Sequence, residues 1–201
     1  MRLFVCGSSL EAYWIDGVRV IRVDDIETNA SLRDCAWLVL ERDATERRRL
    51  VARIEAAGGR FATRIAPGPR IAPRPPVGAG SYLAAPVLIS SNTTLGRHAL
   101  VESNVIIGHD CVVGDFVTIG AAVSIAGHVV IHDDAILEPG AVVPNGRPDR
   151  PLVVGRGARV RAGAVVMRSV PAGADVIGNP GRVVRQAVEM RRGGTERQES
   201  P

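Results

Sequence analysis

Aliphatic residues recur at every sixth position from residue 71 to residue 143 of this chain. The series is unbroken and consists only of isoleucine, leucine and valine: Ile71, Val77, Leu83, Ile89, Leu95, Val101, Ile107, Val113, Ile119, Ile125, Ile131, Leu137 and Val143. An amphipathic helix has a period of 3.6 residues and a strand a period of two, so neither explains an interval of six. Hexapeptide repetition of this kind predicts a parallel β-helix.

Small residues accompany this repeat in two ways. Small or β-branched residues tend to stand four positions after each aliphatic, and they predict a second inward stripe. A glycine often follows the aliphatic directly, at Gly78, Gly96, Gly108, Gly114 and Gly120. Glycine adopts backbone angles that other residues avoid. We therefore expect these glycines to supply unusual angles at the corners between strands.

Composition excludes several classes of protein. The 201 residues contain no lysine, which rules out lysine nucleophiles and Schiff bases. Aromatic residues make up only 3% of the chain, so we expect no nucleic-acid partner, because base stacking needs aromatic platforms. The absence of a long apolar run and of a secretory leader predicts a cytoplasmic protein without a membrane partner. The cysteines Cys6, Cys35 and Cys111 lack the spacing of a metal site or a disulfide framework.

Residues 1–66 differ from the repeat and predict a small α/β, Rossmann-like domain with a parallel sheet. An amphipathic helix is expected over Arg47–Ala57, stopped by Gly58 and Gly59. The expected strands are the apolar runs Leu3–Cys6, Val18–Val23, Cys35–Leu40 and Phe61–Ile65.

A proline-rich passage places the domain boundary near residue 67. The repeat then breaks at residues 144–151 and resumes at Val154, so we expect this loop to be an insertion between coils. Residues 67–190 are predicted to form the β-helix, with a short helix over Val183–Met190. Residues 191–201 are polar and predicted to form a disordered tail.

His109 and Asp110 lie outside the inward stripes. A histidine near neutral pH is the usual general base for acyl transfer. In hexapeptide-repeat proteins three hexads make one coil, which gives this chain roughly five and a half coils and places Gly127 one coil beyond His109. The Gly127 amide is expected to donate to a developing oxyanion. A solvated corner pair on a non-catalytic scaffold is the alternative, because repeat proteins often bind without catalysing.

The string from Ile107 to Phe116 resembles the sialic-acid O-acetyltransferase and bacillosamine N-acetyltransferase type of left-handed β-helix sugar acyltransferases. Further strings extend the similarity over nearly the whole chain: Asp24–Asp25, Phe61–Pro67, Ile71–Pro73, Ala126–Val129, Ala162–Val166 and Val176–Arg182. The resemblance implies a homotrimer that uses acetyl-CoA and acylates an amino or hydroxyl group of a sugar or nucleotide sugar. We expect no metal.

The same resemblance implies roles for individual residues. His109 is the base and Asp110 its partner, while Gly127 meets the thioester carbonyl. Pro139 and Gly163 line the pantetheine groove, and Arg182 lies near the CoA phosphates. The N-terminal domain holds the acceptor, for which the candidate residues are Gly7, Ser8, Asp24 and Asp25.

Two departures from the family pattern concern the acceptor. The family has a glycine-rich turn followed by histidine where this chain has Gly7-Ser8-Ser9-Leu10-Glu11, and the last two residues crowd that turn and add a negative charge. Many members also carry a second histidine nine residues after the first, at the position of Thr118 here. We expect the Thr118 hydroxyl to contact the acceptor instead. A trimeric scaffold with a degraded acceptor pocket is consistent with both changes.

The other histidines leave one further alternative. Together with His109, His98, His128 and His132 suggest a γ-carbonic-anhydrase-like metalloprotein, which would use three imidazoles. Their spacing disfavours it, because His128 follows His109 by one coil plus one residue. His128 stands one coil above Asp110, so we expect it to border the cleft. Six arginines cluster near the insertion and either face CoA phosphates or form a solvated face: Arg147, Arg150, Arg156, Arg159, Arg161 and Arg168.

Overall fold

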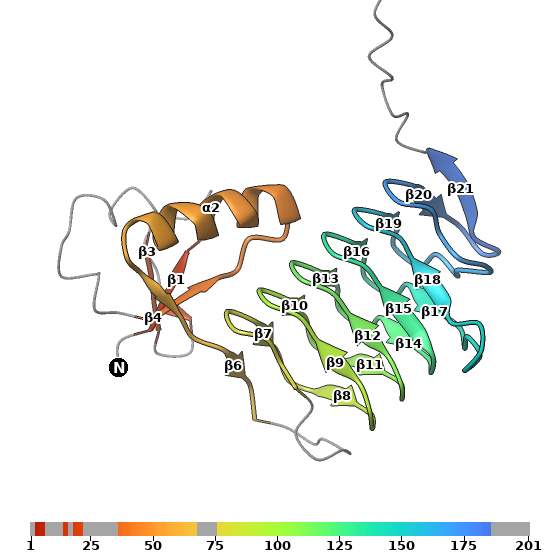
Figure 1. The fold of residues 1–201 in the computed structure, drawn as a ribbon, viewed down its shortest axis with the longest axis horizontal. Coiled ribbons are helices and arrows are strands. Elements are labelled where there is room, and N and C mark those ends of the chain that lie inside the picture. Colours follow the sequence, from red (N-terminus) through yellow and green to blue (C-terminus); the bar gives the residue numbers. More distant parts are fainter. Residues whose placement is uncertain (1–2, 7–13, 16–17, 22–35, 68–75, 186–201) are drawn as a thin grey trace, which may run out of the picture.

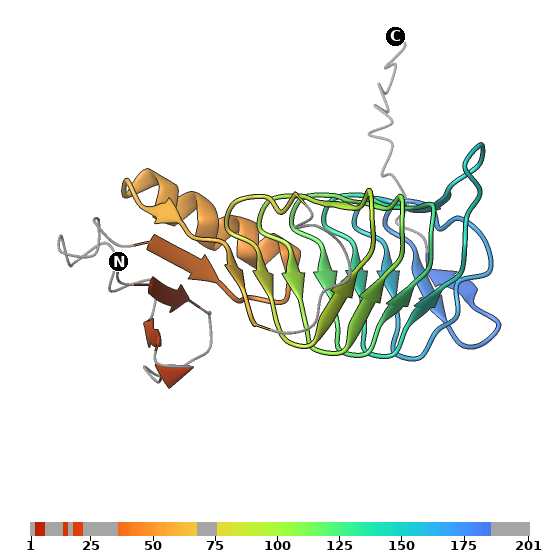
Figure 2. The same ribbon diagram turned by 90° about the horizontal axis from the view of Figure 1, so that it is seen from below.

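The computed structural model describes residues 3–6, 14–15, 18–21, 36–67 and 76–185. The repeat region forms a parallel β-solenoid of about six turns, built from very short strands that stack from coil to coil (Figures 1 and 2). The hexapeptide β-helix predicted from the sequence is thereby confirmed.

Three sheets form the walls of the solenoid. Sheet 1 contains β6 (Arg64–Ile65), β7 (Tyr82–Leu83), β10 (Leu100–Val101), β13 (Thr118–Ile119), β16 (Ile136–Leu137), β19 (Arg159–Val160), β20 (Asp175–Ile177) and β21 (Arg182–Arg185). Sheet 2 contains β8 (Val87–Ile89), β11 (Val105–Ile107), β14 (Ser124–Ile125) and β17 (Val142–Val143). Sheet 3 contains β9 (Thr94–Leu95), β12 (Val112–Val113), β15 (Val129–Ile131) and β18 (Leu152–Val154).

The hexad aliphatics fill the interior of the coils. Val113 pairs with Leu95 of the preceding coil and with Ile131 of the following one, so equivalent side chains stack on each other. All three are buried, and burying an aliphatic side chain stabilises the fold by about 1.5–3 kcal/mol. Cys111 stands four positions after Ile107, on the second stripe predicted to point inward, and it is buried; burial raises the pKa of its thiol.

The glycines that follow the aliphatics allow close approach between coils. A Cβ on Gly108 would lie 2.5 Å from the carbonyl carbon of Ala126, and one on Gly78 would lie 2.4 Å from that of Gly96. None of the five has a left-handed backbone, so the expectation of unusual angles is wrong. The left-handed conformation falls two positions later in the hexads. It is adopted by Gly80 and Gly140 and by eight non-glycine residues: Asn92, His98, Asn104, Asp110, Phe116, Ala122, His128 and Asp134.

The insertion and the C-terminal end were predicted with different success. Ile131 of β15 pairs with Val154 of β18, so the coil continues beyond the loop at residues 144–151, as predicted. The helix expected over Val183–Met190 is wrong in its described part, because Val183 and Val184 belong to β21, which pairs antiparallel with β20. Residues 186–190 and the 191–201 tail lie outside the described residues.

The N-terminal unit contains a second sheet and a helix. The sheet has the order β2 (Trp14–Ile15), β3 (Val18–Ile21), β1 (Leu3–Cys6), β4 (Ala36–Val39) and β5 (Arg60–Phe61), and all neighbours except β2 and β3 are parallel. The helix α2 (Ala44–Ala56) begins after Asp43, whose side chain accepts a hydrogen bond from the Glu46 amide. The four expected strand regions and the helix are therefore present.

The final expected strand, Phe61–Ile65, is divided between the two sheets. β5 pairs with β4 of the N-terminal sheet, whereas β6 pairs with β7 of the solenoid. The change of sheet occurs at Ala62–Thr63, ahead of the boundary expected near residue 67. α2 packs beside sheet 1 of the first coils (Figure 1). Within the described part of the chain, no helix has the length and apolar character needed to cross a membrane.

Candidate active site

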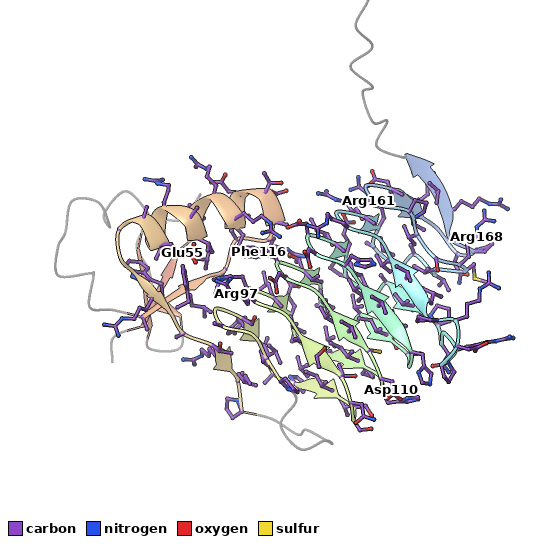
Figure 3. The ribbon with its side chains drawn as sticks, in the orientation of Figure 1. Glu55, Arg97, Asp110, Phe116, Arg161 and Arg168 are labelled. Atoms are coloured by element: carbon purple, nitrogen blue, oxygen red, sulfur yellow. The ribbon has the colours of Figure 1, made fainter. Side chains whose placement is uncertain are left out.

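His109 and Asp110 lie at the corner between sheets 2 and 3. β11 ends at Ile107 and β12 begins at Val112, so both residues belong to the turn that joins them. Their side chains are 50% and 39% exposed, and the labelled Asp110 lies at the edge of the coils away from α2 (Figure 3). The prediction that the imidazole lies outside the packed interior is confirmed.

The two side chains form a hydrogen-bonded pair. Nδ1 of His109 lies 2.7 Å from Oδ2 of Asp110, while Oδ1 of Asp110 accepts a hydrogen bond from Nδ2 of Asn92 at 3.0 Å. The bond from His109, followed by the bond from Asn92, holds the pKa of Asp110 below its ordinary value. Because an ionised carboxylate only accepts, the neutral imidazole carries its proton on Nδ1, and Nε2 is free to accept one.

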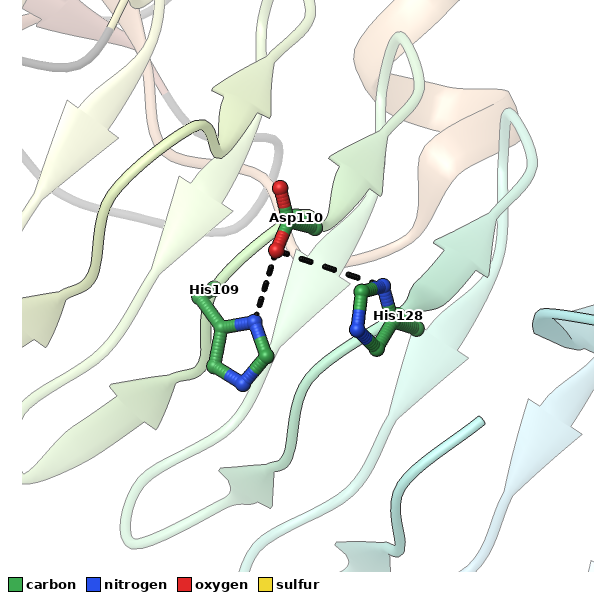
Figure 4. Close-up of side chains that lie close together, drawn as sticks. All are labelled: His109, Asp110 and His128. Atoms are coloured by element: carbon green, nitrogen blue, oxygen red, sulfur yellow. Dashed lines mark hydrogen bonds and ion pairs between the residues drawn. The ribbon is translucent and has the colours of Figure 1, made fainter. Parts of the chain in front are cut away.

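His128 brings a second imidazole to the same corner. It lies one coil beyond Asp110, with its Nδ1 4.0 Å from Asp110 Oδ2. The rings of His109 and His128 meet edge-on, with centroids 4.9 Å apart, and Figure 4 shows one carboxylate oxygen of Asp110 facing both rings. Asn92, Asp110 and His128 are spaced by one coil and share the left-handed conformation, so they form a column.

These side chains also offer donors for a metal ion. Within the described residues, His109, Asp110 and His128 each present one donor atom, and the three atoms lie within 4.8 Å of one another. Two imidazoles and a carboxylate suit zinc and similar ions. The position of His128 above Asp110, expected from the eighteen-residue coil, is confirmed. The spacing disfavours a metal site, whereas the structure brings the donor atoms of His109 and His128 together. His98 does not join them, because it is buried between Phe61 and Phe116.

Gly127 lies against the His109 ring. A Cβ on Gly127 would lie 2.6 Å from Nε2 of His109, so only glycine leaves room for the imidazole in this position. The Gly127 amide, expected to be free for an oxyanion, instead donates to Oδ1 of Asn145 at 2.6 Å. The amide therefore already has a partner in this structure, and its role toward an oxyanion stays a prediction.

The expectation that Thr118 contacts the acceptor is wrong. Thr118 lies in β13 of sheet 1, whose outer face carries α2, and its side chain is fully buried. Its hydroxyl donates to the carbonyl of Arg42 at 2.8 Å and accepts from Nη1 of Arg47 at 3.0 Å. The side chain therefore ties the helix region to the coil and is not accessible to a ligand.

The residues expected to bind cofactor are divided between two corners. Pro139 and Gly163 are exposed and adjacent, with the Gly163 amide donating to the Pro139 carbonyl at 3.0 Å. They lie at the corner between sheets 1 and 2, so sheet 2 separates them from Gly127. Arg182 begins β21 and is exposed. Gly7, Ser8, Asp24 and Asp25 lie outside the described residues.

Three of the six arginines near the insertion form ion pairs. Arg156 lies 2.9 Å from Asp133, and Arg159 lies 4.0 Å from Glu138. Arg161 contacts Glu138 at 3.1 Å and Asp175 at 2.9 Å, and the bond to Asp175 raises its pKa. The ion pairs of these three arginines favour the interpretation of a solvated face.

Sequence reasoning missed Asn92 and Asn145. Asn92 precedes Asp110 by one coil and donates a hydrogen bond to its carboxylate. Asn145 follows Gly127 by one coil and accepts a hydrogen bond from its amide. The eighteen-residue spacing was the available signal for both.

Apolar side chains flank this corner on both sheets. Ile106 and Val142 point outward from sheet 2 and are 48% and 36% exposed, and Val112 points outward from sheet 3 and is 49% exposed. Leu88, beside Ile106 in the pairing, is partly exposed. Exposed aliphatic side chains grouped in this way are typical of an interaction surface.

Known proteins resemble this chain in sequence and in fold. Residues 110–145 match the bacterial transferase hexapeptide family (six repeats). WeeI from Acinetobacter baumannii AYE is 32% identical, with a TM-score of 0.74 over 89% of this chain and 84% of that one. The acetyltransferase domain of PglB from Neisseria gonorrhoeae FA1090, in complex with acetyl coenzyme A, is 20% identical, with a TM-score of 0.77 over 90% and 98%.

A histidine variant of perosamine N-acetyltransferase from Caulobacter crescentus, in complex with CoA and GDP-perosamine, is 23% identical, with a TM-score of 0.79 over 92% and 97%. No curated protein sequence matches significantly. The coils and their repeats define a hexapeptide-repeat protein. By its likeness to WeeI over most of both chains, the chain belongs to the hexapeptide family of bacterial sugar acetyltransferases, which confirms the resemblance seen in the sequence.

Proposed function

We propose that this protein is an acetyl-CoA-dependent acetyltransferase that acylates an amino or hydroxyl group of a sugar or nucleotide sugar. The observation that carries the proposal is the 2.7 Å contact between His109 Nδ1 and Asp110 Oδ2 at an exposed corner. The acetyl coenzyme A complex of PglB and the GDP-perosamine complex of the Caulobacter enzyme support the choice of substrates.

The proposed transfer is direct. Nε2 of His109 removes the proton from the acceptor as its nitrogen or oxygen attacks the thioester carbonyl, and the ionised Asp110 stabilises the resulting imidazolium. The tetrahedral intermediate then breaks the carbon–sulfur bond, and the imidazolium returns the proton to the CoA thiolate. The Gly127 amide would stabilise the oxyanion once Asn145 Oδ1 releases it.

The proposed assembly is a cytoplasmic homotrimer of left-handed solenoids. The apolar side chains Ile106, Val112 and Val142 would pack against neighbouring subunits beside the His109 corner. Acyl-CoA would lie along sheet 2, from Gly127 to Pro139 and Gly163, with its phosphates near Arg182. A Rossmann-like domain ahead of the solenoid would hold the acceptor through Gly7, Ser8, Asp24 and Asp25.

The test is turnover of a His109→Ala variant, measured by release of the CoA thiol. A thermal-shift screen of sugars and nucleotide sugars first identifies the acceptor, because a ligand of the native state raises the melting temperature. We expect turnover to fall by at least about a hundredfold, as for loss of a general base, while CoA still raises the melting temperature. Unchanged turnover contradicts the assignment. CoA binding without any transfer by the wild type indicates the scaffold alternative.

A metalloprotein is the second candidate, favoured by the convergence of His109, Asp110 and His128. Elemental analysis of the protein purified without chelators tests it. One zinc or iron per chain, lost in His128→Asn, supports that function. Substoichiometric metal together with acetyl transfer supports the transferase.

A further inference from the structure

We propose that Asn92 is a positioning residue that fixes the carboxylate of Asp110 so that one oxygen faces His109. The inference rests on the proposed function of the His109–Asp110 pair. Asn92 precedes Asp110 by one coil, and its carboxamide donates from Nδ2 to Oδ1 of Asp110 at 3.0 Å. Oδ2 is thereby directed to Nδ1 of His109, at 2.7 Å.

The need for such a residue follows from the exposure of the pair. The terminal torsion of an aspartate is broad, and the Asp110 side chain is 39% exposed, so water competes for both oxygens. His128 Nδ1, at 4.0 Å from Oδ2, lies beyond hydrogen-bond distance. Among the described residues, the side-chain hydrogen bonds to the carboxylate therefore come from Asn92 and His109.

The backbone presents the two side chains to each other. Asn92 and Asp110 have φ values of 57° and 55°, and the Asp110 amide donates to the carbonyl of Ser91 at 3.0 Å. The two corners therefore stack in the same conformation, with their side chains adjacent. Asparagine tolerates this left-handed conformation better than most residues, so backbone preference alone is the competing explanation for Asn92.

Asn104 provides a matched control for that explanation. It is also an exposed asparagine with a left-handed backbone, at a φ of 60°. It lies at the corner between sheets 1 and 2, because it stands between β10 and β11. A substitution at Asn104 therefore reports the cost of changing a left-handed corner without touching the carboxylate of Asp110.

The experiment compares two substitutions at both positions. Asn→Gly keeps the left-handed backbone and removes the carboxamide, whereas Asn→Asp keeps the size of the side chain and replaces the donor with a carboxylate oxygen. We expect Asn92→Gly to lower kcat about tenfold, with the KM for acetyl-CoA within about twofold, since a charge-assisted hydrogen bond is lost. Asn92→Asp should lower kcat further, because it places like charges together. Asn104→Gly and Asn104→Asp should stay within about twofold of the wild type.

A second readout does not depend on turnover. The NMR resonance of the His109 Nδ1 proton reports its hydrogen bond to Asp110, and we expect it to shift or broaden in both Asn92 variants and in neither Asn104 variant. If this pattern appears in a protein that transfers no acetyl group, the positioning role stands and the proposed function fails. Unchanged kcat and resonance in Asn92→Asp, or equal losses at Asn104, would overturn the positioning role.

Discussion

The imidazole of His109 rests against Gly127, so closely that a Cβ on Gly127 would lie 2.6 Å from Nε2. The backbone of Gly127 is not left-handed, so alanine is compatible with its conformation. Glycine is required at this position because the His109 ring occupies the space of a side chain, and not because of the backbone conformation.

Gly127→Ala is therefore expected to displace the imidazole while the coil remains intact. We expect turnover to fall by at least about tenfold, because a misplacement of about 1 Å can cost about a hundredfold in rate. The melting temperature should change little. Steady-state kinetics and thermal unfolding check both expectations, and full activity with an unshifted His109 Nδ1 proton resonance would contradict them.

Ile106→Glu is expected to disrupt the proposed trimer. Ile106 is 48% exposed on sheet 2 beside the His109 corner, and a carboxylate there would be desolvated on assembly at a cost of several kcal/mol. Light scattering after size exclusion should change from three times the 21.3 kDa chain mass to the mass of one chain. The control is Ala52→Glu, at an exposed position of α2. A variant that stays trimeric would place the interface elsewhere.

Arg47→Met is expected to destabilise the contact between α2 and the solenoid. The Arg47 guanidinium is fully buried and donates to Thr118 Oγ1 at 3.0 Å and to the carbonyl of Phe116. Burial lowers the pKa of Arg47 to about 10, so it stays charged at neutral pH. Losing these bonds should reduce the free energy of unfolding by about 2–4 kcal/mol.

Urea unfolding at one protein concentration measures this loss. The matched control is Arg49→Met, on the same helix, which removes an exposed ion pair with Glu46 and should cost no more than about 1 kcal/mol. Equal losses in the two variants would show that the buried guanidinium adds nothing to stability.

His98 is expected to make stability depend on pH. The ring is 1% exposed, its two nitrogens have no hydrogen-bond partner among the described residues, and burial, followed by the charges of Arg97 and Arg47, lowers its pKa to about 4. The unfolded chain takes up this proton near the ordinary pKa of about 6.5. Titration of His98 should therefore leave the free energy of unfolding unchanged above about pH 6.5 and lower it as the pH drops from about 6.5 to about 4.

His98→Phe removes this titration. Phe116 has the same left-handed conformation one coil further on, so phenylalanine is suited to the position. Between pH 7.5 and 4.5 the wild type should lose about 2–3 kcal/mol more free energy of unfolding than the variant. Parallel pH profiles for the two proteins would show that His98 does not titrate as described.

The sequence by itself determined the solenoid, the inward direction of the hexad aliphatics and the outward position of His109. A burial pattern with a period of six is local to the chain, so the sequence of each hexad is enough to predict which of its side chains point inward. The same pattern singled out the neighbouring Asp110, and the break in the six-residue repeat predicted the insertion at residues 144–151.

Only the tertiary structure decided what stacks on each corner and what covers each face. Asn92 and Asn145 reach the site because coils register at eighteen residues, and that register also places backbone against Gly108. Thr118 is inaccessible because α2 and Arg47 cover sheet 1, a contact between residues far apart in the chain. Such roles depend on which side chain arrives from the next coil or from another element, and no single hexad specifies that neighbour.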